Sequence, residues 1–125
     1  MTNHLKLADS YLRLSDEEKK YGNESESITN QREIIRDYCK KQGIIIVSEF
    51  VDDGYSGGNF ERPGFQAMLN HLAAGKANTV ITKDLSRLGR DMTESSYYAE
   101  RFFPEHGIHY LAPGNDFDSM GDNLM

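Results

Sequence analysis

The sequence predicts an α/β domain with a mostly parallel central sheet of about four to five strands flanked by helices. Short β-branched or apolar runs alternate with segments in which apolar residues recur at helical spacing. The segments between successive strands are long enough for helical crossovers, which join parallel strands. A chain of 125 residues suits a single domain.

The first strand is expected at residues 5–14, where an apolar run around Tyr11 leads into a polar segment. Residues 16–26 are dense in charge and have no apolar period, so we expect a loop there. Ser25 or Ser27 is the candidate N-cap of the helix that follows.

The first helix is expected to run from that cap to Gly43, a residue that suits a helix C-terminus. Ile35 and Cys39 belong to its apolar face, and charged residues cover the opposite face. The β-branched run at 44–47 is too short for another helix and apolar on both faces. This pattern is typical of a buried parallel strand.

A second helix is expected from Pro63, which suits a first helical position, to just before Gly75. Residues 79–82 form the predicted third strand because they are short and β-branched. The apolar stripe of the second helix consists of Phe65, Met68, Leu69, Leu72 and Ala73.

A third helix is expected to begin at the capping residue Thr93 and to be kinked or ended by Pro104. Residues 108–111 form the predicted fourth strand. The tail from Pro113 is polar and glycine-containing, so we expect a loop.

Charge and cysteine content restrict the class of protein. The formal net charge of −6 argues against a chain that binds a polyanion over its whole surface, so any DNA contact is expected to be local or assisted. The single Cys39 cannot form an internal disulfide, and no cysteine and histidine cluster has zinc spacing. Without a signal peptide or membrane span, a cytoplasmic protein without structural metal is expected.

Three arginine-bearing segments, 11–15, 56–63 and 86–90, each follow a predicted strand. Carboxyl ends of parallel strands meet at one edge of a sheet, so these segments are expected to converge. Arginine donates paired hydrogen bonds to phosphate oxygens and stays charged. Each such bond contributes roughly 1.5–3 kcal/mol, so losing one costs about tenfold or more in rate. The predicted phosphate site with its hydroxyl nucleophile comprises Arg13, Ser15, Arg62, Arg87 and Arg90.

Each segment alone has a simpler structural interpretation. An arginine and a serine at a strand end are usually a surface pair, and two arginines three apart usually lie on a solvated face. Asp52 and Asp53 would normally be turn residues. No histidine lies near these segments in the sequence to activate Ser15. Only the joint placement favours a functional site.

Four ordered motifs stand out: Tyr11-x-Arg13-x-Ser15, then Ser27-Ile28-x-Asn30-Gln31, then Asp52-Asp53-Gly54-Tyr55-Ser56-Gly57 through Arg62-Pro63-Gly64-Phe65, then Lys83-Asp84-Leu85-Ser86-Arg87-Leu88-Gly89-Arg90. Together they strongly resemble the catalytic domain of the serine site-specific recombinases, the resolvase and invertase family. The resemblance spans residues 11–122 and is greatest to the large serine recombinases of mobile elements such as transposons.

The resemblance implies a DNA recombinase in which Ser15 attacks a DNA phosphodiester. A 5′-phosphoseryl intermediate would allow strand exchange, as in the integration or excision of a mobile element, and reverse attack would rejoin the DNA. Because bond energy is kept in the phosphoserine, neither a metal nor a nucleotide cofactor is expected. The implied phosphate ligands are Arg13, Arg87 and Arg90, with support from Arg62, Gln31, Asp53 and Ser56.

One departure concerns proton transfer. Many small resolvases place an aspartate directly before the first arginine of the last motif, whereas this chain has Ser86 there and Asp84 two residues earlier. Both are supporting candidates, and the general base stays open. The charged segment between Ser15 and Ser27 exceeds the small-resolvase spacing, which favours the large subclass.

The family carries a long dimerising helix and DNA-binding domains beyond the catalytic core. We therefore expect residues 1–125 to be a resolvase-type catalytic domain, a fragment that lacks both and is inactive alone. Binding of double-stranded DNA and assembly into a dimer and a synaptic tetramer are expected of the full-length protein, without membrane contact.

Two alternatives stay open. One is a non-catalytic phosphate- or nucleotide-binding domain on the same fold, in which Ser15 is only a ligand. The other is an interaction-only remnant of a mobile element, whose exposed aromatic residues at 97–103 pack against a partner.

Overall fold

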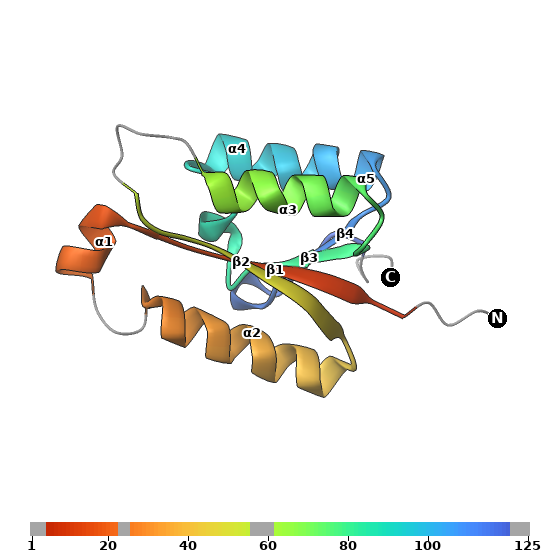
Figure 1. Ribbon diagram of the computed structural model, residues 1–125, viewed down its shortest axis with the longest axis horizontal. Helices are drawn as coiled ribbons and strands as arrows, with labels where there is room; N and C mark the ends of the chain where they lie inside the picture. Colours follow the sequence, from red (N-terminus) through yellow and green to blue (C-terminus); the bar gives the residue numbers. More distant parts are fainter. Residues whose placement is uncertain (1–4, 23–25, 56–61, 121–125) are drawn as a thin grey trace.

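The computed structural model describes residues 5–22, 26–55 and 62–120. Within these residues five strands form one sheet in the order β2-β1-β3-β4-β5 (Figure 1). The first four pair in parallel and β5 pairs antiparallel with β4. The strands are β1 (Leu7–Ser15), β2 (Ile45–Tyr55), β3 (Thr79–Ile81), β4 (His109–Ala112) and β5 (Phe117–Asp118). The predicted α/β class with a mostly parallel sheet is confirmed.

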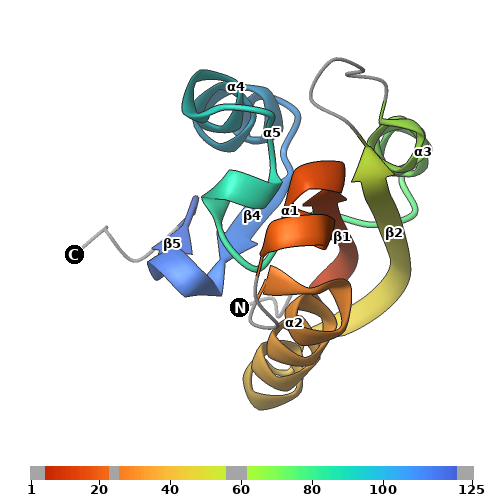
Figure 2. The ribbon, with the colours of Figure 1, turned by 90° about the vertical axis from the view of Figure 1, so that its left-hand side faces the viewer.

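Helices cover both faces of the sheet. Helix α2 (Ile28–Gln42) lies on one face and α3 (Pro63–Ala73) on the other, beside the helix that begins with α4 (Met92–Tyr97) (Figure 2). Alternate side chains of a strand point to opposite faces. Tyr11 therefore joins Phe65 of α3 in one apolar cluster, whereas Leu12 joins Ile35 of α2 in the other. Full burial of each such side chain contributes about 1.5–3 kcal/mol.

Helix α2 has the ends that the sequence predicts. The Ser27 hydroxyl accepts a hydrogen bond from the Asn30 N–H at 3.0 Å. At the other end, Gly43 adopts a left-handed conformation with φ of 72°, which suits glycine. Ile35 and Cys39 are buried in the core as expected.

The loop predicted at 16–26 is wrong for its first half, because helix α1 spans Asp16–Tyr21. The Ser15 hydroxyl accepts the Glu18 N–H while the Glu18 carboxylate accepts the Ser15 N–H, which forms a capping box. Acidic residues lie in its first turn and basic residues in its last, as the helix dipole favours. The helix buries no side chain among the residues described, so its sequence needs no apolar period, and none is present to predict it.

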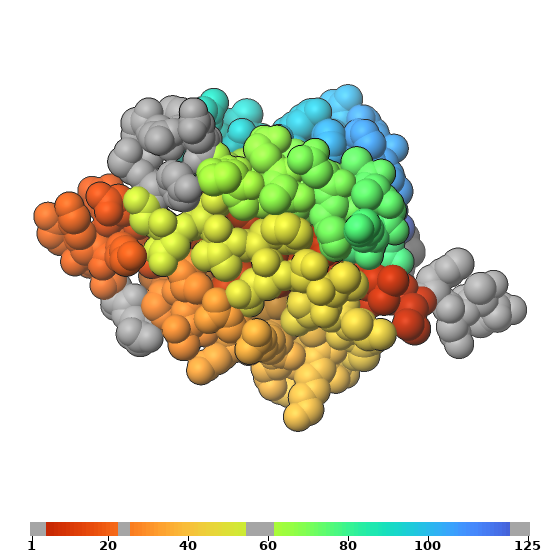
Figure 3. Space-filling view, viewed as in Figure 1, coloured from red at the N-terminus to blue at the C-terminus, as the bar shows by residue number. Residues whose placement is uncertain are grey.

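The run at 44–47 forms a strand as predicted, but the expectation that both its faces are buried is wrong. Strand β2 is at the edge of the sheet, and its residues reach the surface between α2 and α3 (Figure 3). Ile45 and Val47 are 48% and 42% exposed. Ile44 and Ile46 belong to the α2 side of the core. Strand order decides this difference, because only an edge strand lacks a second neighbour.

The third helix begins two residues earlier than predicted, because Asp91 and not Thr93 is its N-cap. Its middle is a π-helical turn at Tyr98–Phe102, followed by α5 (Phe103–Glu105). Proline lacks an N–H and its ring clashes with the preceding turn, which the wider π turn accommodates. The helix ends one residue beyond Pro104, consistent with the predicted ending.

The expected loop from Pro113 is also wrong in part. A 3-10 turn at Pro113–Asn115 leads into β5, which extends the sheet. Asp118 pairs with His109 across the two strands, and the Ser119 hydroxyl accepts the Tyr110 N–H at 2.8 Å. No helix among the described residues is long and apolar enough to cross a membrane.

Candidate active site

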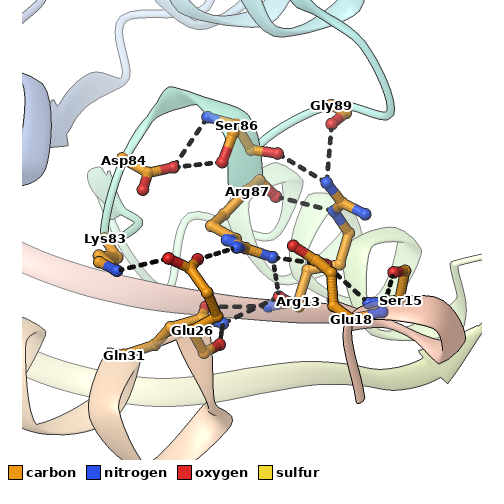
Figure 4. Close-up of polar contacts among 10 residues, drawn as sticks. All are labelled: Arg13, Ser15, Glu18, Glu26, Gln31, Lys83, Asp84, Ser86, Arg87 and Gly89. Atoms are coloured by element: carbon orange, nitrogen blue, oxygen red, sulfur yellow. Dashed lines mark hydrogen bonds and ion pairs between the residues drawn. The ribbon is translucent and has the colours of Figure 1, made fainter. Parts of the chain in front are cut away.

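Strands β1 and β3 run parallel, so the described segments that follow them lie at the same end of the sheet. Helix α1 follows β1 directly, and the loop after β3 contains the 3-10 turn η2 (Leu85–Arg87). This end brings Arg13, Ser15 and Arg87 into one hydrogen-bonded network (Figure 4).

Arg87 is the most buried arginine of the network, with a side chain only 3% exposed. Its Nη1 donates to the Arg13 carbonyl and to Glu18 Oε1, both at 2.9 Å, and its Nη2 donates to Glu26 Oε1 at 2.5 Å. Burial by itself would lower the pKa of Arg87, but the hydrogen bond and charge of Glu18, with Asp84 and Glu26, raise it. Arg87 is therefore a firmly charged centre.

Arg13 stabilises the loop after β3 through hydrogen bonds to its backbone. Its guanidinium donates to the carbonyl oxygens of Ser86 at 2.6 Å, Gly89 at 3.2 Å and Arg87 at 3.4 Å. Burial lowers the pKa of Arg13, and the nearby positive charges of Arg87 and Arg62 act in the same direction. These contacts fix the backbone that carries Arg87.

Ser15 is partly buried at the point where β1 becomes α1. Its hydroxyl oxygen accepts the Glu18 N–H at 3.0 Å, and its own N–H donates to Glu18 Oε1 at 3.0 Å. The same Glu18 oxygen binds Arg87. Ser15 and Arg87 are thus joined through one carboxylate.

Arg62 also supports the loop after β3. It donates to the Leu88 carbonyl at 2.7 Å and pairs with Glu94 at 3.3 Å. Its guanidinium lies 4.0 Å from the ring centroid of Phe65, in cation–π range. Arg90 is exposed at the end of the loop, where its N–H donates to Glu94 Oε1 at 2.8 Å.

Gln31 is fully buried beneath the network. Its Nε2 donates to the carbonyls of Arg13 at 2.9 Å and Glu26 at 3.1 Å, and its Oε1 accepts the Arg13 N–H. In the loop after β3, Asp84 Oδ1 accepts the Ser86 hydroxyl at 2.5 Å and the Ser86 N–H at 3.0 Å. Gln31 and the Asp84–Ser86 pair, which were predicted as supporting residues, therefore lie next to the loop after β3 or the network that holds it.

The two adjacent aspartates of β2 have different surroundings. Asp53 is exposed and lies 3.6 Å from Lys19, outside the arginine network. Asp52 is 1% exposed and accepts hydrogen bonds from the Tyr11 hydroxyl at 2.6 Å, the Gly64 N–H at 2.8 Å and the Phe65 N–H at 3.0 Å. Asp52 thus ties β1 to the start of α3. The predicted supporting residue Ser56 lies outside the described residues.

Several residues that organise the site were not identified from the sequence. The buried Ser95 hydroxyl donates to the Leu85 carbonyl at 2.7 Å and accepts the Gly89 N–H at 2.9 Å. A Cβ at Gly89 would lie 2.6 Å from the Ser95 nitrogen, so glycine permits this approach. The Ser-x-x-Glu pattern that starts at Ser15 is a sequence signal for Glu18, but no local pattern marks Ser95.

Within 5–22, 26–55 and 62–120, no group of three or more histidine, cysteine, aspartate or glutamate side chains is placed to hold a metal ion. The guanidinium groups of Arg13, Arg62 and Arg87 instead lie together around the loop after β3, where they donate to its carbonyl oxygens and to the Arg13 carbonyl. Such an arrangement can bind an anion and hold a hydroxyl group beside it.

Comparisons with known proteins identify the family and the fold. The family model "Resolvase, N terminal domain" matches residues 8–123. The uncharacterized immunity region protein 3 of Bacillus phage phi105 is 35% identical over 65 residues, which are 52% of this chain and 77% of that protein.

Solved structures with the same fold include the N-terminal catalytic domain of TP901-1 integrase, with a TM-score of 0.78 and 24% identity over 94% of this chain and 85% of that chain. A resolvase family site-specific recombinase from Streptococcus pneumoniae has a TM-score of 0.76 and 23% identity, over 96% and 80%. The family match extends over nearly all of the sequence, and the fold agrees with it. The chain therefore belongs to the resolvase family and contains the N-terminal domain of that family.

Proposed function

We propose that Ser15 is the nucleophile that cleaves DNA and that Arg87 is the principal ligand of the scissile phosphate. The observation that supports this proposal is the position of Ser15 at the carboxyl end of β1. Its hydroxyl accepts the Glu18 N–H, and its own N–H shares the Glu18 carboxylate with the buried guanidinium of Arg87. A charged donor beside a hydroxyl is the arrangement that phosphoryl transfer requires.

In the proposed step, Ser15 Oγ forms a bond to phosphorus and the bond from phosphorus to the 3′ oxygen breaks. The serine proton is released and the 3′ oxygen takes one up, which leaves a 5′-phosphoseryl linkage and a free 3′-hydroxyl. Positive charge around the phosphorus stabilises the transition state. Reverse attack by a 3′-hydroxyl restores the serine.

The other predicted site residues are proposed to position Arg87, to bind the phosphate or to support the site. Arg13 and Arg62 hold the backbone of residues 86–89 through its carbonyl oxygens, which sets the position of Arg87. Arg90, exposed at the end of that loop, is proposed as a second phosphate ligand. The Asp84–Ser86 pair, Gln31, Asp53 and Ser56 are proposed as supporting residues.

Membership of the resolvase family implies a DNA substrate and self-association in general. We propose the finer assembly of the family for the full-length protein, a dimer that forms a synaptic tetramer. The net charge of −6 leaves little non-specific affinity for DNA, which supports a DNA-binding region outside these residues and an inactive isolated domain. A cytoplasmic location is part of this proposal.

The test uses full-length protein, a nicked DNA substrate and a denaturing gel that detects covalent protein–DNA adducts. Ser15→Ala should abolish the adduct while DNA binding survives. Ser27→Ala is the matched control, because its hydroxyl also caps a helix at 3.0 Å. It loses a cap but should keep the adduct.

Adducts that persist in Ser15→Ala would overturn the assignment of the nucleophile. Saturable phosphate binding without any adduct in the wild type would favour the alternative of a non-catalytic phosphate-binding domain.

A further inference from the structure

The guanidinium of Arg87 is already occupied by carboxylates of its own chain. Glu18 and Glu26 bind different terminal nitrogens of this side chain, at 2.9 and 2.5 Å (Figure 4). Lys83 lies 3.8 Å from the second oxygen of Glu26. Carboxylate and phosphate oxygens compete for the same arginine donors, because both accept paired hydrogen bonds.

The bonding of Arg87 is also incomplete. Its Nε is buried and has no hydrogen-bond partner among the residues described. A buried donor without a partner is destabilising, because it has lost its hydrogen bonds to water. A tetrahedral anion offers more acceptor oxygens around one centre than either carboxylate does, so exchange of the carboxylates for phosphate has a physical basis.

Glu18 connects this occupancy to Ser15. One oxygen, Oε1, accepts both the Arg87 Nη1–H and the Ser15 N–H. The Glu18 N–H in turn holds the Ser15 hydroxyl oxygen. A displacement that moves Glu18 Oε1 away from Arg87 therefore also breaks its bond with the Ser15 N–H, which is one of the two hydrogen bonds of the capping box.

We propose that Glu18 and Glu26 act as internal occupants of the phosphate site, which a DNA phosphate must displace from Arg87 before Ser15 is released for attack. This inference rests on the proposed function of the same site. Glu18 belongs to α1 and Glu26 precedes α2. In this proposal their two carboxylates restrain cleavage until a phosphate is in place.

The test measures binding of inorganic sulfate to the 125-residue chain, because sulfate stays a dianion across the working pH range. Sulfate is titrated while the side-chain Nε–H resonance of Arg87 is followed by NMR. Glu18→Gln/Glu26→Gln keeps side-chain acceptors at both positions but removes their charges. Glu17→Gln/Glu33→Gln is the control, with the same charge change at two exposed positions.

We expect Glu18→Gln/Glu26→Gln to bind sulfate at least about tenfold more tightly than the control, since each competing charged hydrogen bond is worth about 1.5–3 kcal/mol. Dissociation constants within twofold of each other would overturn the proposal. Circular dichroism establishes that both variants are folded.

A second measurement needs no variant. In the wild-type chain, sulfate should shift the carboxyl ¹³C resonances of Glu18 and Glu26 and the amide resonance of Ser15, but not the carboxyl of Glu33. Unmoved Glu18 and Glu26 resonances at saturating sulfate would contradict displacement. An unmoved Ser15 amide would contradict its coupling to the anion.

These outcomes are independent of the adduct test. Suppose that Glu18→Gln/Glu26→Gln binds sulfate more tightly but the full-length protein forms no phosphoseryl adduct. This result would support Glu18 and Glu26 as internal occupants and would contradict Ser15 as the nucleophile. A Ser15-dependent adduct with equal sulfate affinities would do the reverse.

Discussion

Replacement of Asp52 by asparagine should destabilise the domain much more than the same change at its neighbour Asp53. Asp52 Oδ2 accepts the Tyr11 hydroxyl and the Phe65 N–H, and Oδ1 accepts the Gly64 N–H. An asparagine amide has one oxygen, so its nitrogen must face at least one of these donors.

The expected magnitude follows from this geometry. An unsatisfied buried N–H costs about 1–3 kcal/mol, and the remaining hydrogen bonds lose about half of their strength when the charge is removed. Asp52→Asn should therefore lower the free energy of unfolding by roughly 2–5 kcal/mol, a large part of the 5–15 kcal/mol typical of a domain. Asp53 is exposed beside Lys19, and such a surface pair contributes about 0–1 kcal/mol.

Urea unfolding followed by circular dichroism measures both variants against the wild type. Tyr11→Phe, which removes one donor, should cost about 1 kcal/mol, and its effect should shrink in the Asp52→Asn background because the two residues share a hydrogen bond. The reasoning is refuted if Asp52→Asn and Asp53→Asn differ by less than about 0.5 kcal/mol.

Three further outcomes are expected. Ser95→Ala removes the hydroxyl that holds backbone groups of residues 85–89, so urea unfolding should show a loss of about 1–3 kcal/mol; a neutral effect would contradict this role. Burial alone would raise the pKa of Glu18, but its hydrogen bonds with Arg87 and the backbone lower it. The charged Glu18 therefore stabilises the fold above its unfolded pKa of about 4.3, and this stabilisation is lost as the pH falls through its folded pKa. The difference in free energy of unfolding between wild type and Glu18→Gln should thus narrow from pH 6 to pH 3. A difference independent of pH would contradict this role of Glu18. Burial raises the pKa of Cys39 to about 11, so a thiol reagent at pH 8 should label it only on unfolding, and rapid labelling of the folded chain would count against its burial.

Helices α2 and α3 could be predicted from the sequence because each has a buried apolar stripe, and the ends of α2 at Ser27 and Gly43 were also predicted. The cap predicted for the third helix, Thr93, was wrong. Ile35 and Cys39 lie on one side of α2, and Phe65 and Met68 on one side of α3, because residues three or four apart share a helix face. Helix α1 could not be predicted by this criterion, since it buries no side chain among those described and depends on its capping box.

The sequence could not predict which of two neighbouring polar residues is buried. Asp52 and Asp53 have the same side chain, and the alternation of the strand alone decides which one faces the core. The edge position of β2 likewise depends on strand order, a long-range property that local residue patterns do not contain.

The sequence by itself determined that strands alternate with helices and that arginine-bearing segments follow them, because periodicity and strand-end position are local properties. Only the tertiary structure decided what each arginine contacts. Arg13 and Arg62 bind backbone carbonyls, whereas Arg87 binds Glu18 and Glu26. These partners come from segments distant in the chain, and a guanidinium is directed by whichever acceptors folding places within hydrogen-bonding distance.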